Sequence, residues 1–361
     1  MDGDRRAALR AAKLAALVRD QRGEGTTKPA VYPGGAALAR GTEGWVYADE
    51  RPLRSLGGAL AWATQHDLDE LHLIVDGAEA AGHLARRATY FDQPPTVWVV
   101  DGRALVRAEP SALPIVEPVA ADIAAHGAFM GRIGAIPVDE HGILAGEVYG
   151  LEVCRAFRDP NTGVARLEVG LGAADREAFR LIHGDDPPAE VAIEIVGRIA
   201  EHRRPGAPGH ALNRLAAERR LRHALIEDPS MISARSLVAV PPPLPRTNLK
   251  DSIPCVASGV DGDGHALVVV CTVGVDLDVV PVGADARAAV GARAGRLGRS
   301  GAAERREVSQ PDRAVAEDPA VEASPSSRLV IVVPERDAHP ALVRLMARLR
   351  EPGEIRIAAI P

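Results

Sequence analysis

The chain has 361 residues, a length that favours two or three domains over a single large one. Its 46% hydrophobic and 25% charged residues are typical of a soluble globular protein, and its formal net charge of −6 argues against a surface coated in nucleic acid. No apolar run reaches the roughly 18 residues that a membrane-spanning helix needs, and residues 1–22 lack the apolar core of a signal peptide, so we expect a cytoplasmic protein with no membrane partner.

Residues 1–43 are predicted to form an N-terminal helix followed by an edge segment. Over residues 5–22 the apolar residues recur at helical spacing, and Gly23 and Gly25 end the pattern. The polar face of this helix carries basic side chains: Arg5, Arg6, Arg10, Lys13, Arg19 and Arg22. Such a face is compatible with an arm that binds nucleic acid and also with a solvated helix surface.

Residues 44–110 are predicted to form a first α/β module. Strands are expected at 45–48, 71–75 and 97–100, with helices at 53–65 and 77–90 between them. This alternation predicts a mainly parallel sheet with right-handed crossovers. The continuous apolar run at 71–75 is typical of a strand that is covered on both faces.

Residues 111–240 are predicted to form a middle α+β segment. It is expected to contain strands at 147–157 and 164–169, and helices at 119–129, 175–182, 190–203 and 212–226. The two strands are predicted to form a hairpin, because the sequence at 158–163 combines Pro, Asn and Gly at turn positions.

Residues 241–361 are predicted to form a second α/β module. Its expected strands are 267–271, 329–333 and 355–358, and its expected helices are 283–290 and 341–350. Residues 291–327 are rich in Gly, Ala, Arg, Glu, Ser and Pro, which predicts a disordered insertion. The element order parallels that of the first module. We therefore predict an α/β fold with two related modules, which would be an internal duplication, flanking the middle segment.

Asp49 and Arg51 follow the first strand of the first module, before the helix and strand that come next. This order is similar to the trailing half of the PD-(D/E)xK, or restriction-endonuclease-like, superfamily, in which acidic residues hold a divalent metal and a Lys orients the attacking water. The resemblance implies that Asp49 is a catalytic, metal-binding residue and that Arg51 stands where the Lys belongs, with Glu43 as the nearest candidate for an earlier acid. The implied cofactor is Mg²⁺ or Mn²⁺, which would activate water for phosphodiester hydrolysis.

Glu152 and Glu168, in the predicted hairpin of the middle segment, are further candidate catalytic and metal-binding residues. If the strand register places them directly opposite each other, their carboxylates lie about 5 Å apart at Cβ and repel unless a metal or a proton intervenes. If the register differs by one residue, they point to opposite faces. Glu117 and Glu147 could join the first arrangement. A solvated strand face is the alternative interpretation.

Asp276 and Asp278 alternate directly after the strand at 267–271. The carboxyl edge of a parallel sheet is where α/β folds place their sites, which makes the two residues a candidate site. The alternative is that they simply precede a helix, whose N-terminus favours acidic residues.

The chain lacks the short motifs of several enzyme classes. It has no Gly-x-x-x-x-Gly-Lys phosphate loop, no Gly-x-Gly-x-x-Gly, no His-Glu-x-x-His and no Gly-x-Ser-x-Gly. The sequence from Asp261 to His265 is predicted to be a hairpin turn, because it lacks the later ligand positions of a calcium loop.

The sequence leaves three functional hypotheses. The first is a nucleic-acid-associated protein with a nuclease-like fold and metal-dependent phosphodiesterase activity. The second is a non-catalytic scaffold, with degenerate nuclease-like modules, for a protein partner or a homo-oligomer. The third is a small-molecule binder near Asp76 or Asp278, for which the sequence offers no residue pattern beyond the position of these acids.

Overall fold

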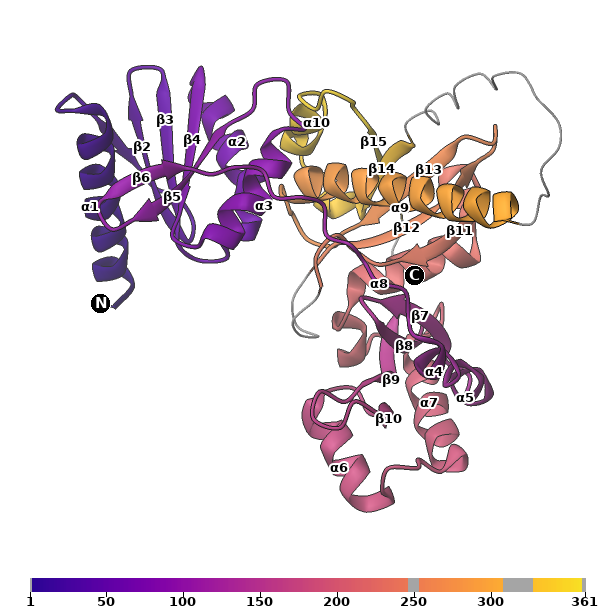
Figure 1. The fold of residues 1–361 in the computed structure, drawn as a ribbon. Coiled ribbons are helices and arrows are strands. Elements are labelled where there is room, and N and C mark those ends of the chain that lie inside the picture. Colours follow the sequence, from indigo (N-terminus) through magenta and orange to yellow (C-terminus); the bar gives the residue numbers. More distant parts are fainter. Residues whose placement is uncertain (1, 246–252, 308–326, 359–361) are drawn as a thin grey trace, which may run out of the picture. The chain divides into compact units, whose positions relative to one another are not determined.

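A computed structural model describes residues 2–245, 253–307 and 327–358 (Figure 1). The chain divides into two compact units, each built from segments that are distant in sequence. Unit 1 comprises Met1–Leu113, Gly274–Asp285 and Val333–Ile357, and unit 2 comprises Pro114–Val273, Ala286–Val332 and Ala358–Pro361. The sequence-based boundaries, in contrast, treat the chain as four successive segments.

A six-stranded mixed sheet forms the centre of unit 1, in the order β1-β2-β3-β4-β5-β6. The strands are β1 (Lys28–Ala30), β2 (Gly35–Arg40), β3 (Glu43–Ala48), β4 (Glu70–Val75), β5 (Thr96–Asp101) and β6 (Ala104–Arg107). The pairs β3–β4 and β4–β5 are parallel, as their crossover helices require, whereas the pairs β1–β2, β2–β3 and β5–β6 are antiparallel. The apolar strand β4 lies inside the sheet, as predicted, and its last five residues are buried.

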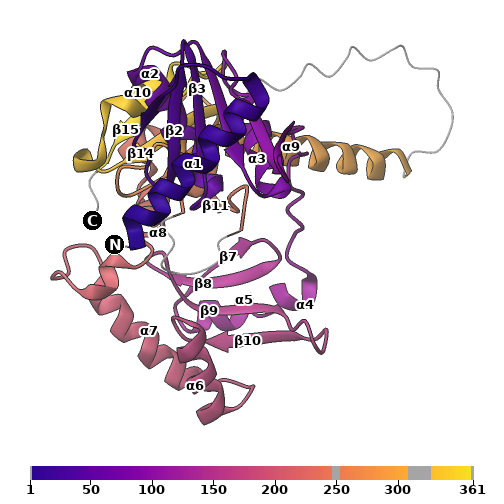
Figure 2. The ribbon, with the colours of Figure 1, turned by 90° about the vertical axis from the view of Figure 1, so that its left-hand side faces the viewer.

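Three helices of unit 1 pack on this sheet: α1 (Asp2–Arg22), α2 (Leu56–Gln65) and α3 (Ala78–Ala88). The unit also contains η1 (Pro52–Arg54), η4 (Glu335–Asp337), α10 (Pro340–Met346) and the first part of α9 (Val279–Glu307). Figure 2 shows α1 crossing the sheet in front of β2 and β3. Leu14, Leu17 and Val18 of α1 pack there against Trp45 and Ile74, which explains the helical spacing of apolar residues in this segment.

Unit 2 contains a four-stranded antiparallel sheet in the order β10-β9-β8-β7. Its strands are β7 (Ile136–Glu140), β8 (Ile143–Val148), β9 (Leu151–Arg158) and β10 (Ala165–Val169). The helices of this region are α4 (Ala121–Ala124), α5 (Gly127–Arg132), α6 (Ala173–His183), α7 (Ala189–Arg203) and η2 (Ala211–Arg214). Met130, Leu151 and Val196 belong to the apolar core beneath the sheet.

A five-stranded sheet has the order β11-β12-β13-β14-β15. The strands are β11 (Ala234–Val240), β12 (Cys255–Asp261), β13 (Ala266–Cys271), β14 (Arg328–Val333) and β15 (Glu354–Ile357), preceded along the chain by α8 (Ala217–Glu227) and η3 (Pro229–Ile232). The pairs β11–β12 and β12–β13 are antiparallel, and β13–β14 is parallel. Leu221 and Leu225 of α8 pack in one core with Val269 and Val332.

The predicted α/β class is confirmed, although the sheets are mixed because hairpins add antiparallel strands to the parallel pairs. The relation between the two modules by duplication stays a prediction. Several local predictions are wrong. The helix predicted at 212–226 is interrupted, because Ala216 has a positive φ of 47° between η2 and α8. Residues 147–157 are not one strand, because Tyr149 and Gly150 turn the chain with positive φ angles of 46° and 75°. Residues 291–307 are not a disordered insertion but continue α9, and residues 308–326 lie outside the described residues.

A close backbone contact within unit 1 gives the first testable prediction. A Cβ atom on Gly57 of α2 would lie 2.2 Å from the backbone oxygen of Leu277. Gly57→Ala should therefore destabilise the protein by about 1–3 kcal/mol, despite the higher helix propensity of alanine. Chemical denaturation measures this loss. The control is Gly197→Ala in α7, where the new Cβ meets no atom within 4 Å. Its free energy of unfolding should stay equal or rise by up to about 1 kcal/mol. Equal stabilities for the two variants would contradict the contact.

Candidate functional site

The predicted catalytic residue Asp49 forms an ion pair in unit 1. Strand β3 ends at Ala48, so Asp49 follows the strand, and its Oδ2 accepts a hydrogen bond of 2.6 Å from Nε of Arg10. Arg51 lies in the left-handed region with a φ of 50°. Glu43 begins β3 and therefore lies about 20 Å from Asp49 at 3.3 Å per residue, too far to share one metal ion. The structure thus separates the two acids of this predicted site.

The basic face of α1 is largely occupied by acidic residues of the same unit. Arg10 also donates to Glu50, Lys13 donates to Asp76, and Arg22 lies 3.5 Å from Glu43. These pairs occupy basic side chains that could otherwise contact nucleic-acid phosphates. An arginine-rich helix face is therefore weak evidence for nucleic-acid binding in this chain.

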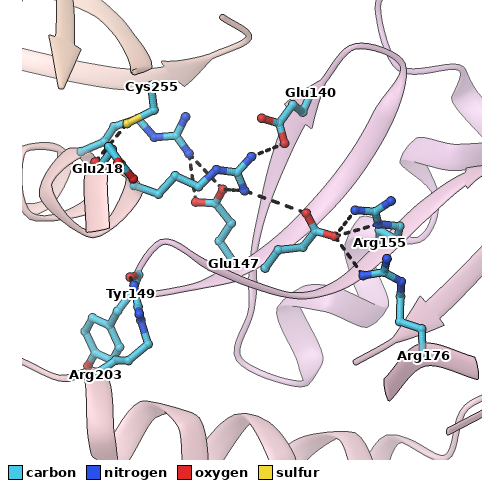
Figure 3. A network of polar contacts seen from close by, with 11 residues as sticks. Glu140, Glu147, Tyr149, Arg155, Arg176, Arg203, Glu218 and Cys255 are labelled. Carbon is cyan, nitrogen blue, oxygen red and sulfur yellow. Dashed lines mark hydrogen bonds and ion pairs between the residues drawn. The ribbon is translucent and has the colours of Figure 1, made fainter. Parts of the chain in front are cut away.

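The other two predicted site residues, Glu152 and Glu168, lie in the antiparallel sheet of unit 2. Figure 3 shows the polar network of this region, with Glu147, Arg155 and Arg176 among the labelled residues. The register places Glu168 opposite Arg155 and Glu152 opposite Glu147, so the directly opposite arrangement of Glu152 and Glu168 is not formed. A guanidinium joins them instead, because Arg176 lies 3.6 Å from Glu152 and 3.3 Å from Glu168.

Glu152 belongs to a buried network of carboxylates and guanidinium groups. Arg219 of α8 pairs with Glu147 at 2.7 Å, approaches Glu152 at 4.0 Å, and also pairs with Glu140. Burial by itself would lower the pKa of Arg219, but Glu147 and Glu140 outweigh burial and raise it. Arg222 adds a second guanidinium 3.0 Å from Glu147. A carboxylate cluster therefore surrounds Arg219, but its members are Glu140, Glu147 and Glu152 rather than the predicted pair of Glu152 and Glu168, and guanidinium groups of the chain are its cations.

The turn between β8 and β9 fits against α8 and holds this network together. A Cβ atom on Gly150 would lie 2.3 Å from the backbone carbon of Arg219, so only glycine permits this approach. The neighbouring carbonyl of Tyr149 accepts a hydrogen bond of 2.9 Å from the buried Arg203. The network therefore has a structural explanation in its packing.

Two groups of side chains in the described residues have donor atoms close enough to share a metal ion: Glu43, Glu70 and His72, and Asp261, Asp263 and His265. In the first group, Nδ1 of His72 accepts a hydrogen bond from Trp98, so the proton of the neutral ring sits on Nε2, the atom near Glu70. Burial lowers the pKa of His72 to about 4, which keeps the ring neutral.

The second group forms the hairpin turn predicted between β12 and β13. Asp261 accepts hydrogen bonds from the backbone N–H groups of Asp263 and His265. It also forms an ion pair of 2.8 Å with Arg328. These hydrogen bonds, together with Arg328, lower the pKa of Asp261 to about 2. The second group is thus explained by contacts within the chain, whereas Nε2 of His72 in the first group has no hydrogen-bond partner among the described residues.

Unit 1 contains a cavity of 810 Å³ that offers a different kind of site. Its walls come from the 31–33 turn between β1 and β2, helix α2, the 275–278 segment before α9, and the start of α10. The volume lies within the range of about 300–1,000 Å³ that is typical of small-molecule sites.

Asp276 and Asp278 form the acidic wall of this cavity. Asp276 pairs with Arg54 at 2.6 Å, and Oδ1 of Asp278 accepts a hydrogen bond of 3.0 Å from the backbone N–H of Gly57, near the start of α2. Burial raises the pKa of both acids, and repulsion from Asp276 helps to raise that of Asp278 to about 7. Asp278 can therefore exchange a proton near neutral pH.

A second buried cluster in unit 1 pairs two arginines of α3 with Asp285, so the guanidinium groups of these arginines are already engaged by an acid outside the acidic wall. Asp285 of α9 accepts hydrogen bonds from Arg86 at 2.8 and 2.9 Å, from Arg87 at 3.2 Å and from Tyr90 at 3.1 Å. Arg87 also donates to the carbonyl of Leu53. Arg87 therefore acts on Asp276 and Asp278 through its charge, without a hydrogen bond, and this charge lowers the pKa of each carboxyl group.

Polar groups also come from the other walls. The hydroxyl of Tyr32 donates to the carbonyl of Ser55 at 2.8 Å. Nδ1 of His339 accepts from the backbone N–H of Ala341, which places the ring proton on Nε2. Trp62 is buried, and its indole N–H has no hydrogen-bond partner among the described residues.

The sequence signal for this cavity was limited to its acidic wall. Asp276 and Asp278 follow a buried strand at alternating positions, and this position was recognised as a candidate site. Trp62, Arg54 and His339 were not predicted, because no local pattern links residues of three distant segments. Only their contacts in the folded chain reveal them.

Comparison of the chain with protein-family models, with curated proteins and with solved structures finds no match in any of the three. The resemblance to the PD-(D/E)xK superfamily therefore stays a prediction. None of the helices in the described part of the chain combines the length and the apolar character that a membrane span requires.

The network in unit 2 predicts a large stability loss when its central guanidinium is removed. Arg219→Met leaves the carboxylates of Glu140, Glu147 and Glu152 with one cation fewer, and should cost about 3–5 kcal/mol in chemical denaturation. As a control, Arg198→Met removes an exposed pair with Glu194 and should change stability by about 0.5 kcal/mol or less. A loss no larger than that of the control would show that the network does not depend on Arg219 for stability.

The raised pKa of Asp278 predicts that the stability of the protein depends on pH. Its pKa is about 7 in the folded chain against an ordinary value of 3.8, so the folded state retains a proton that the unfolded state releases between these values. Raising the pH through this window therefore lowers stability. Asp278→Asn removes this titration. The substitution should therefore raise the free energy of unfolding more at pH 8 than at pH 4, with a difference of at most about 4 kcal/mol.

Chemical denaturation at the two pH values measures this difference. The exposed Asp69→Asn serves as the control and should show no comparable gain at pH 8. A gain for Asp278→Asn that is the same at both pH values would contradict the raised pKa.

Proposed function

We propose that this chain binds a small polar ligand in the cavity of unit 1. The observation that carries the proposal is the combination, on the walls of one 810 Å³ cavity, of the buried carboxyl group of Asp278, the half-buried carboxyl group of Asp276 and donors from other segments. Burial of such groups costs free energy unless partners compensate it. A ligand that hydrogen-bonds to them would recover part of this cost.

The composition of the walls also supports binding. Apolar side chains such as Val31, Leu277 and Leu345 line the cavity together with a few polar groups, which is the usual composition of a small-molecule site. Asp278 is the lining residue with the most strongly shifted acid pKa, and shifted groups concentrate at functional sites. Asp278 can accept or donate a hydrogen bond near neutral pH, which suits it to recognition or to proton transfer.

Filling the cavity should abolish binding. Ala61 lines it from α2, so Ala61→Phe places a ring in the space that the ligand would occupy. The matched control is Ala78→Phe, which adds the same ring at an exposed position at the start of α3. Thermal-shift and NMR screening against a broad library of polar metabolites should find ligands for the unaltered chain and for Ala78→Phe, but not for Ala61→Phe. If no ligand is found for the unaltered chain, or if Ala61→Phe binds as well, the proposal fails.

The two functions first predicted from the sequence remain separate proposals with less support. Phosphodiester hydrolysis would need Asp49, Glu152 and Glu168 as metal ligands, yet each of them pairs with an arginine. A scaffold function is favoured by Leu181 and Ile182 of α6, whose large apolar side chains are 72% and 74% exposed. Salt dependence separates the two, because phosphate binding must weaken steeply as salt rises and an apolar protein interface should not.

A further inference from the structure

We infer that the ligand of the unit 1 cavity is a small zwitterion, with an amine held by Asp278 and a carboxylate held by the donors of α10. This inference rests on the proposed function and adds the chemical class of the ligand. It is based on which polar atoms of the walls already have partners within the chain and which do not.

The acceptor side of the cavity is Asp278. Its Oδ1 accepts one hydrogen bond, from the N–H of Gly57, and its Oδ2 accepts none from the described residues. The neighbouring Asp276 already has a guanidinium partner in Arg54. An ammonium group beside Asp278 would provide the close positive charge and the donors that this carboxylate lacks.

The donor side comes from His339 at the start of α10 and from Arg344 within it. His339 presents Nε2–H because its Nδ1 is used at the start of α10. Arg344 is exposed and makes no ion pair with the described residues. A carboxylate accepts hydrogen bonds from both kinds of donor, and it pairs with a guanidinium in a bidentate geometry.

Charge balance distinguishes a zwitterion from a simple cation or anion. Asp276 and Arg54 neutralise each other, which leaves Asp278 and Arg344 as the charged lining groups of opposite sign. A cation alone would leave the donors of α10 unused, and an anion alone would meet the charge of Asp278. A ligand of zero net charge with separated poles uses both sides.

The protonation of Asp278 connects this ligand to pH. The groups that act on Asp278 are Asp276 from its own segment, Arg54 and the N–H of Gly57 from the region of η1 and α2, and Arg87 from α3. The hydroxyl of Tyr32, from the segment between β1 and β2, also interacts electrostatically with Asp278. Since Asp278 loses its proton around pH 7, an ammonium group should bind more tightly at pH 8 than at pH 6.

The test compares three probes with the same six-carbon chain: 6-aminohexanoate, hexylamine and hexanoate. Isothermal titration calorimetry on the full chain should show that 6-aminohexanoate binds at least about tenfold more tightly than either singly charged probe, a difference of about 1.4 kcal/mol. Glycine and 4-aminobutanoate extend the series to shorter separations between the poles. Any one of these zwitterions with the stated advantage over its singly charged analogues supports the inference.

Variants assign the two poles. Asp278→Asn should remove the advantage of the zwitterion over hexanoate and its increase from pH 6 to pH 8, while Arg344→Gln should remove the advantage over hexylamine. The control Arg103→Gln makes the same change at an exposed position outside the cavity and should leave all affinities unchanged.

Similar affinities for the three probes, or an advantage that survives both variants, overturn the zwitterion inference. If the probes do not bind but other members of the metabolite library do, the inference fails and the proposed function stands. If no small molecule binds at all, both fail.

Discussion

The pairing of buried carboxylates with guanidinium groups is the constraint on which both units depend. In unit 1, Asp285 receives hydrogen bonds from Arg86 and Arg87. In unit 2, Arg219 lies among three glutamates. A buried charge is tolerated only when it is paired and hydrogen-bonded, and arginine suits this role because it stays charged and donates in several directions. Some of the arginines of the chain therefore serve its interior rather than its surface.

This pairing also explains why carboxylate clusters are ambiguous in a sequence. Glu152 and Glu147 do face each other across two strands, which is an arrangement that favours a cation between them. The sequence cannot tell whether that cation is a metal ion or the side chain of a residue some seventy positions away, as Arg219 is from Glu147. The cavity in unit 1 differs because one of its two carboxylates, Asp278, has no guanidinium hydrogen-bonded to it.

Local patterns predicted most of the elements but few of the contacts. The apolar run of β4, the strand and helix alternation that follows, and the hairpin turn at Asp261 are all properties of adjacent residues, so their prediction required no tertiary information. The break at Tyr149 and Gly150 was missed because a non-glycine residue with positive φ is rare and leaves little trace in a hydropathy pattern. The ion pair of Arg54 with Asp276 joins residues 222 positions apart, beyond any periodicity.

Unit 1 is built from three segments that are distant in sequence, so the ribosome synthesises its parts at different times. When residue 113 has been synthesised, the whole six-stranded sheet and helix α2 are already present. The carboxyl groups of the cavity arrive only with Asp276 and Asp278, and the imidazole of His339 and the guanidinium of Arg344 emerge later still. A truncated nascent chain thus carries the sheet without a finished pocket, and recognition of the ligand becomes a property of the completed polypeptide alone.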